Sequence, residues 1–125
     1  MAQNRSNGTK LEVFSGKEAS LNRVILQILR QKGALIPYDV SLNVKRVKDF
    51  IHTGPKTVYR RMEAQEEQGW IGVVGNRLTK PGWCSDLYGI THRGKAALRL
   101  DEWNIEDFLR TATDEQLIKF IDAFA

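Results

Sequence analysis

The sequence contains little of what several common protein classes require. Its single cysteine, Cys84, excludes an internal disulfide and a cysteine-rich zinc site. The only two histidines, His52 and His92, come with no further ligand at a metal-binding spacing. No run approaches the ~20 apolar residues of a membrane span, and residues 1–10 lack the apolar core of a secretory signal. We therefore expect a cytoplasmic protein without a metal, a cofactor or a membrane partner.

Groups that could carry catalysis are also sparse. No Gly-rich phosphate loop is present, and the acidic residues fall on predicted helix surfaces or near the C-terminus rather than in a paired arrangement. Cys84 has no second cysteine as a partner, so an ordinary thiol is favoured over a redox sensor. These features predict a protein that is not an enzyme.

What the sequence does contain is an uneven distribution of charge. The chain has 125 residues, which suits one domain, and a net charge of +4. Residues 1–100 hold 17 Lys and Arg against 8 Asp and Glu, whereas residues 101–125 hold 2 against 7. Between Lys45 and Arg61, six basic residues accompany one acidic residue, Asp49. Such a region is typical of nucleic-acid binding, although a charge run alone is as often a solvated surface.

The basic region includes the segment over residues 54–71, GPKTVYRRMEAQEEQGWI, which predicts one helix. Pro55 suits the first helical position after Thr53 or Gly54 as N-cap, and Gly69 is a natural stop. The charges run against the helix dipole, because the basic residues come first and the acidic residues last. A local rule broken in this way indicates a functional demand, such as contact of the basic half with a nucleic acid.

The other segments predict an α+β fold that is mostly α-helical. Hydrophobic spacing and β-formers predict helices over residues 18–32, 42–52, 92–100 and 102–110, a connector over 34–37, and strands over 70–74 and 87–91 around a polar loop, 75–86. Thr91 caps one helix, and a capping box at Thr113–Gln116 opens a last one. We divide the chain into a flexible arm, residues 1–14, whose residues 11–14 can pack on the core, a domain, 15–100, and an acidic helical segment, 101–125.

Two segments resemble winged-helix transcription regulators. The segment KTVYRRMEAQEEQGWI is similar to their recognition helix, and YGITHRGKAAL, residues 88–98, is similar to the segment that closes the wing in MarR- and PadR-like regulators and their archaeal relatives. The resemblance implies a winged helix-turn-helix DNA-binding domain over residues 15–100, with a β-hairpin wing and extra C-terminal helices. Gln65 departs from the usual core leucine, so that either packing is looser there or Gln65 has a hydrogen-bond partner. The loop over residues 75–86 is also longer than usual.

The resemblance and the charges together give the expected contacts with double-stranded DNA. Lys56 and Arg60 would read base edges from the major groove, whereas the other basic residues and two hydroxyls would contact the backbone or the minor groove. The full set is Lys45, Arg46, Lys48, Lys56, Thr57, Tyr59, Arg60, Arg61, Arg77 and Lys80. Two alternatives stay open, in which Tyr59 is half-buried and Arg61 pairs with an acid such as Asp49. Trp83 is expected to pack back on the hairpin.

The acidic segment carries more apolar surface than it can bury alone. We expect its apolar residues to form a homodimer interface, with packing on the first helix of the same chain as the alternative: Trp103, Phe108, Leu109, Leu117, Phe120, Ile121 and Phe124. The predicted function is that of a small dimeric transcription regulator. A plasmid or viral replication or partition initiator, a protein-interaction winged helix and an RNA-binding protein are the alternatives. No effector can be inferred from the residues.

Overall fold

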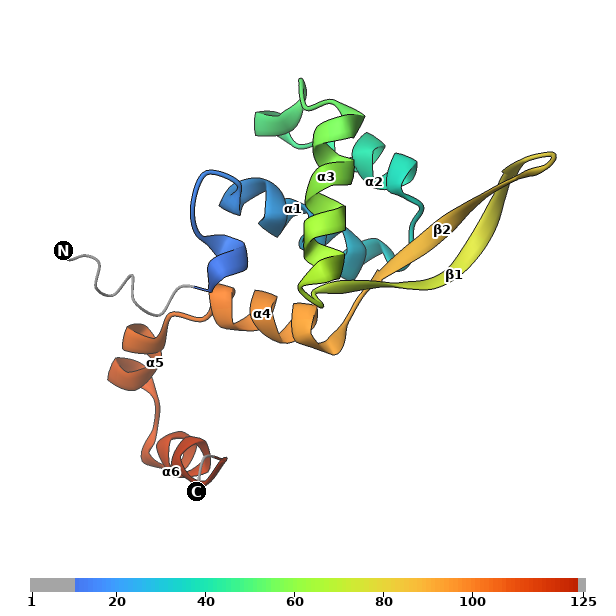
Figure 1. The fold of residues 1–125 in the computed structure, drawn as a ribbon. Helices are drawn as coiled ribbons and strands as arrows, with labels where there is room; N and C mark the ends of the chain where they lie inside the picture. Colours follow the sequence, from blue (N-terminus) through green and yellow to red (C-terminus); the bar gives the residue numbers. More distant parts are fainter. Residues whose placement is uncertain (1–10, 124–125) are drawn as a thin grey trace.

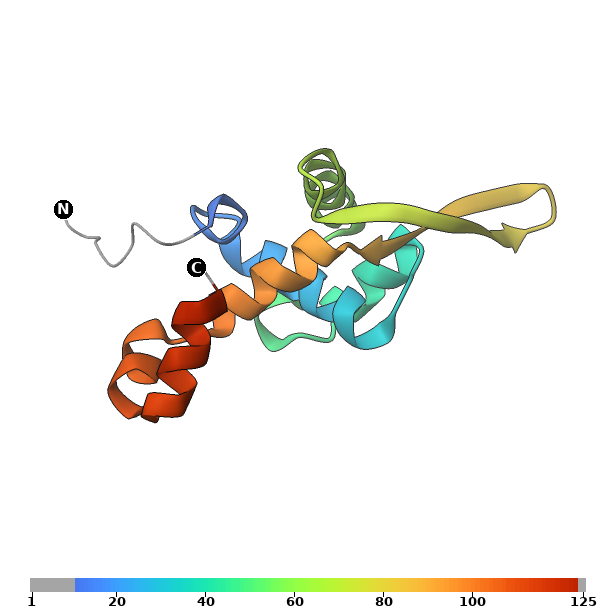
Figure 2. The same ribbon diagram turned by 90° about the horizontal axis from the view of Figure 1, so that it is seen from below.

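The computed structural model describes residues 11–123. Its elements are η2 (Glu12–Phe14), α1 (Ala19–Lys32), α2 (Pro37–Val44), η3 (Lys48–Phe50), α3 (Pro55–Glu67), β1 (Ile71–Lys80), β2 (Trp83–Ile90), α4 (His92–Glu102), α5 (Ile105–Thr111) and α6 (Asp114–Ala123). Figure 1 shows a body made of α1 to α4, from which the β1–β2 hairpin projects at one end and α5 and α6 at the other. The view from below in Figure 2 shows the same arrangement. The predicted α+β class, mostly α, is confirmed.

The core is built around α1. Ile25, Leu26 and Leu29 of this helix are fully buried, because α2, α3, α4 and the hairpin surround it. Val13 and Phe14 also enter the core, so the apolar piece over residues 11–14 packs on the body. The first ten residues of the predicted arm lie outside the described residues. Within residues 11–123, no helix is long and apolar enough to cross a membrane.

The second helix differs from the sequence prediction. A helix over residues 42–52 is wrong, because α2 begins at Pro37, after the extended Ile36, and ends at Val44. Val47 has extended backbone angles, and the chain then forms only the short turn η3. Residues 45–54 therefore connect α2 to α3, whereas the predicted helix over residues 42–52 would have left only a tight turn before α3. Pro37 suits the first position of a helix, and Ile36 before it has the extended conformation that a following proline favours, so α2 begins at Pro37.

The hairpin is longer than predicted. The polar loop expected over residues 75–86 is wrong, because β1 and β2 pair antiparallel from Ile71↔Ile90 to Lys80↔Trp83. The connection is the two-residue turn Pro81–Gly82, in which Gly82 has φ +80°. This is the proline–glycine turn chemistry that favours a positive φ at the second position. The predicted connector before Pro37 forms one bridge, from Leu35 to Tyr88 beside β2.

Two ion pairs hold α4 on α1. Arg23 Nε lies 2.6 Å from Asp101 Oδ2, and Arg30 Nη2 lies 2.8 Å from Glu102 Oε2. The two arginines are seven residues apart and so share one face of α1. The hydrogen bonds and charges of these pairs raise the pKa of both arginines, and the hydrogen bond from Arg30 lowers the pKa of Glu102.

The last two helices form a small unit of their own. Asn104 is the N-cap of α5, because its Oδ1 accepts a hydrogen bond from the Asp107 amide. The helix predicted over residues 102–110 therefore begins later, at Ile105. The capping box of Thr113 and Gln116 is confirmed by two reciprocal hydrogen bonds. The rings of Trp103, Phe108 and Phe120 lie 5.2–5.6 Å apart and form the centre of this unit.

Candidate nucleic-acid interface

The helix α3 forms as its sequence predicts. Gly54 is its N-cap and Pro55 its first residue. At the other end Gly69, with φ +88°, terminates it, and the amides of Gly69 and Trp70 donate to the carbonyls of Glu66 and Gln65. That pair of bonds is the Schellman motif, which satisfies carbonyls left free at a helix end. The boundaries of α3 are therefore fixed by residues local to it.

A buried polar network sets the position of α3 against α1. Asn22 donates from Nδ2 to the Val13 carbonyl at 2.8 Å, and its Oδ1 accepts from Arg61 Nε at 3.0 Å and from Gln65 Nε2 at 3.3 Å. Gln65 Nε2 also lies 3.2 Å from the main-chain oxygen of Asn22. The alternative in which Gln65 has a hydrogen-bond partner is thus the correct one, and Arg61 bonds to Asn22 rather than to Asp49.

The exposed face of α3 gathers the predicted base-reading residues. Lys56 and Arg60 are exposed, Thr57 is half-buried, and Tyr59 is 37% exposed. Together with Glu63 they line a shallow hollow of about 670 Å³ on the surface of the helix. The first turn of α3 contains no acidic residue, so positive charge from the side chains adds to that of the helix N-terminus.

The basic residues between α2 and α3 are all exposed. Lys45 and Arg46 lie in the turn after α2, and Lys48 lies in η3, so none of them is on the helix that the sequence predicts. They precede α3 in the chain and add three positive charges to the connection that leads into it.

The hairpin residues are engaged within the chain. Arg77 Nη1 lies 2.9 Å from Asp39 Oδ2 on α2, which ties β1 to the start of the helix pair. The ammonium of Lys80 lies 5.8 Å from the centre of the Trp83 ring, at the end of the hairpin. Trp83 is 64% exposed, so the expectation that it packs back on the hairpin holds only for its contact with Lys80.

The second motif joins α3, the hairpin and α4. Thr91 Oγ1 accepts the amide of Gly94, as the predicted N-cap, and lies 2.7 Å from the carbonyl of Gly69 and 3.0 Å from that of Trp70. Gly94 is buried, and a side chain there would meet the Trp70 carbonyl and the side chain of Ile90. The threonine and the glycine of this motif therefore serve the fold.

Two solved structures share the fold of this chain. The chain is similar to PadR of Bacillus subtilis, determined in complex with operator DNA, with 23% identity and a TM-score of 0.54 over 86% of this chain and 61% of that chain. It is also similar to a candidate transcriptional regulator of Thermoplasma acidophilum, with 20% identity and a TM-score of 0.53 over 78% of this chain and 100% of that chain. The chain has a winged-helix fold. No family model and no curated protein matches the sequence.

In this winged helix, the β1–β2 hairpin is the wing, and α3 is the helix that leads into it. The chain spans 61% of the length of the PadR chain, so the comparison leaves the rest of that protein without a counterpart here. Residues 11–123 contain no cluster of three or more His, Cys, Asp or Glu side chains that could hold a metal ion.

Sequence reasoning missed the residues that act across elements. The sequence pattern does not single out Asn22 or Asp39, although Asn22 bonds to Arg61 of α3 and Asp39 pairs with Arg77 of the wing. Their polar character at positions next to apolar helix faces was the only available signal. Of the predicted dimer residues, Trp103, Phe108, Leu117 and Phe120 are half-buried, whereas Leu109 and Ile121 are 53% and 63% exposed. Phe124 lies outside the described residues.

Proposed function

We propose that the chain is a sequence-specific double-stranded DNA-binding protein of the cytoplasm, acting as a small dimeric transcription regulator. The observation that carries the proposal is the exposed basic half of α3. It stands at the position of the recognition helix in a fold shared with a regulator determined in complex with operator DNA. Its Lys56 and Arg60 side chains are exposed and lack an ion-pair partner among the described residues.

The proposed contacts divide into two kinds. Arg60 can pair with a guanine edge through two hydrogen bonds, and Lys56 can contact a neighbouring base. The exposed basic side chains outside α3 would bind phosphates and position the protein without reading sequence. They are Lys45, Arg46, Lys48 and Lys80. Thr57 and Tyr59 would donate to phosphates beside them. Arg61 and Arg77 keep partners within the chain, so Arg77 must exchange Asp39 for DNA if it takes part.

Arginine substitution on a selected DNA sequence tests the groove assignment. We expect Arg60→Ala to weaken specific binding by ~1–3 kcal/mol and to relax the preference at one base position. Arg99→Ala, on the exposed surface of α4, removes the same charge away from α3 and serves as the matched control. Equal losses in the two variants would show that charge alone matters and would overturn the assignment.

We also propose that the C-terminal unit joins two copies. Leu109 of α5 and Ile118 and Ile121 of α6 are 53%, 58% and 63% exposed, although the ring cluster of the same unit is already packed. The acidic segment carries net negative charge, so it would avoid DNA while the basic domain binds it. A two-fold dimer would place two α3 helices about one DNA turn, ~34 Å, apart.

The dimer has its own test. We expect Ile121→Glu to yield monomers in sedimentation experiments, because a charge replaces an apolar side chain at the interface. Lys119→Gln changes the net charge by the same amount on the same helix and should leave the dimer intact. A dimer that persists in Ile121→Glu would place the interface elsewhere.

One observation favours a second function, that of a protein-interaction winged helix. The wing exposes Val74, Leu78 and Trp83 by 65%, 70% and 64%, which is unusual for a surface that meets only phosphates. Such a protein would bind DNA weakly and without sequence preference. A replication or partition initiator would select a direct repeat in DNA rather than a two-fold (palindromic) repeat. An RNA-binding protein would prefer RNA duplexes or single strands to duplex DNA.

A further inference from the structure

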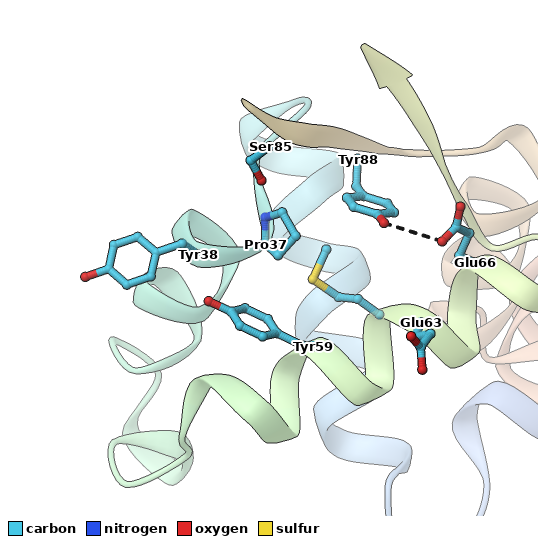
Figure 3. Close-up of a pocket in the computed structure, with 8 residues that line it drawn as sticks. Pro37, Tyr38, Tyr59, Glu63, Glu66, Ser85 and Tyr88 are labelled. Carbon is cyan, nitrogen blue, oxygen red and sulfur yellow. Dashed lines mark hydrogen bonds between the residues drawn. The ribbon is translucent and has the colours of Figure 1, made fainter. Parts of the chain in front are cut away.

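A pocket of about 360 Å³ lies between the start of α2, the middle of α3 and strand β2 of the wing. Figure 3 shows the tyrosine rings and the carboxylates around it, with Tyr38 and Tyr59 on one side and Glu63 and Glu66 on the other. Its volume falls in the range of sites that bind small molecules. The side chains that matter for its chemistry are Tyr38, Tyr59, Met62, Glu63, Glu66 and Tyr88.

The pocket brings together three aromatic rings from three separate elements. Tyr38 comes from α2, Tyr59 from α3 and Tyr88 from β2, so the wing and the helix pair must both be in place to form it. Tyr38 is 54% exposed, and its ring is not part of the hydrophobic core. The faces of aromatic rings carry partial negative charge and attract cations.

The charge of the pocket has one sign. Glu63 and Glu66 line it, no lining residue is basic, and neither carboxylate forms an ion pair with a residue in the described part of the chain. The Tyr88 hydroxyl lies 3.4 Å from Glu66 Oε1. Burial raises the pKa of Tyr88, and the negative charges of Glu66, Asp86 and Glu63 raise it further. The carboxylates therefore make the electrostatic potential at this tyrosine negative.

We propose that this pocket binds a small organic cation, a tertiary or quaternary ammonium compound with an apolar body. The rings would hold the alkyl groups around the charge, Met62 would supply an adaptable apolar contact, and the two carboxylates would compensate the charge. A neutral compound of the same shape gains only the apolar part of this interaction, and an anion is repelled. Tyr59 also belongs to the exposed face of α3, so a bound cation would lie beside the proposed DNA contacts; that consequence rests on the proposed function, whereas the site does not.

The charge requirement can be tested on the free full-length protein. Choline and 3,3-dimethylbutan-1-ol have nearly the same shape, and only choline is charged. Each is titrated into labelled protein while the NMR signals of the tyrosine rings and of the α3 amides are followed. We expect saturable shifts centred on Tyr38, Tyr59 and Tyr88 with choline, and binding about tenfold weaker with the alcohol. Equal affinities, shifts centred elsewhere, or no saturation at millimolar choline would overturn the proposal.

Substitutions separate the ring and carboxylate contributions. Tyr38→Phe keeps the ring and should keep choline binding, whereas Tyr38→Leu keeps an apolar side chain and should weaken binding several-fold. Tyr38 is exposed enough that both variants should fold, which the unchanged core amide signals would verify. Glu63→Gln with Glu66→Gln should also weaken binding, and Glu67→Gln, an exposed acid of α3 outside the pocket, is the matched control. Equal affinity in Tyr38→Leu and Tyr38→Phe, or in the double variant and Glu67→Gln, would contradict the assigned roles.

Discussion

The replacement of Asn22 by alanine tests whether the buried polar network positions α3. The change removes one hydrogen bond to the Val13 carbonyl and two that Asn22 Oδ1 accepts, from Arg61 and from Gln65. Val13 is 2% exposed, so its carbonyl loses a donor that water cannot easily replace. Arg61 is only half-buried and regains water, so its bond adds little.

These contacts give an estimate of the cost. An unsatisfied buried carbonyl costs ~1–3 kcal/mol, and the bond from Gln65 contributes roughly another 1 kcal/mol. Asn22→Ala should therefore lower the free energy of unfolding by about 2–4 kcal/mol. For a domain of this size each kcal/mol moves the melting temperature by roughly 4 °C. Gln65 Nε2 keeps its bond to the Asn22 main chain, which limits the loss.

Denaturant unfolding measured by circular dichroism checks the value, and Gln65→Leu supplies a second variant of the same network. Gln65→Leu removes the two bonds from Gln65 Nε2 to Asn22, and it also removes the buried Gln65 Oε1, which has no hydrogen-bond partner among the described residues. We therefore expect it to lower stability by less than Asn22→Ala does. A loss below ~0.5 kcal/mol in Asn22→Ala, or a larger loss in Gln65→Leu than in Asn22→Ala, would refute the reasoning, since the Asn22 bonds would then not carry the position of α3.

The close packing at Gly94 and the ion pair of Glu102 both contribute to the stability of α4 on the core. Gly94→Ala should lower stability by more than ~3 kcal/mol in thermal unfolding, because the added carbon would lie 2.6 Å from Ile90 Cγ1 and closer still to the Trp70 carbonyl. A melting temperature like that of the parent would contradict the close packing of α4. The Arg30–Glu102 pair lowers the pKa of Glu102 below its ordinary value of 4.5, so its contribution is complete above pH 4.5 and disappears as the pH falls through the lowered pKa. Because both side chains are more than a third exposed, Glu102→Gln should lower the free energy of unfolding by less than ~1 kcal/mol at neutral pH and leave it unchanged in strong acid. Denaturant unfolding at several pH values measures this difference. A difference that grows in acid would contradict the predicted sign.

The helix α3 could be predicted because its signals are local. Pro55 and Gly69 mark its ends by backbone preferences that need no tertiary contact, and the structure confirms both. Thr91 and the capping box at Thr113 were predictable for the same reason. Local capping and turn chemistry thus fixed the elements on which the resemblance to winged helices depends.

The errors arose where pairing across the chain decides the structure. Residues 75–86 look like a loop because they are polar and contain glycine, yet cross-strand pairing extends β1 and β2 up to the turn at Pro81–Gly82. After Val44, the apolar positions suggested a continuing helix, but Val47 has extended backbone angles and Phe50 packs against the core from η3. The bond from Arg77 to Asp39 joins residues 38 positions apart, and no sequence spacing indicates it.

DNA binding by the full-length chain is tested most directly with random-sequence duplex DNA across a salt series, followed by selection of the bound sequences. We expect binding whose affinity falls with salt at a slope of about −4 per chain on logarithmic axes, one unit for each of the four basic side chains outside α3 that are proposed to bind phosphates. We also expect enrichment of a two-fold repeat with half-sites one helical turn apart. No binding near about 50 mM salt would overturn the proposed DNA binding, and the winged helix would then serve contacts with another protein.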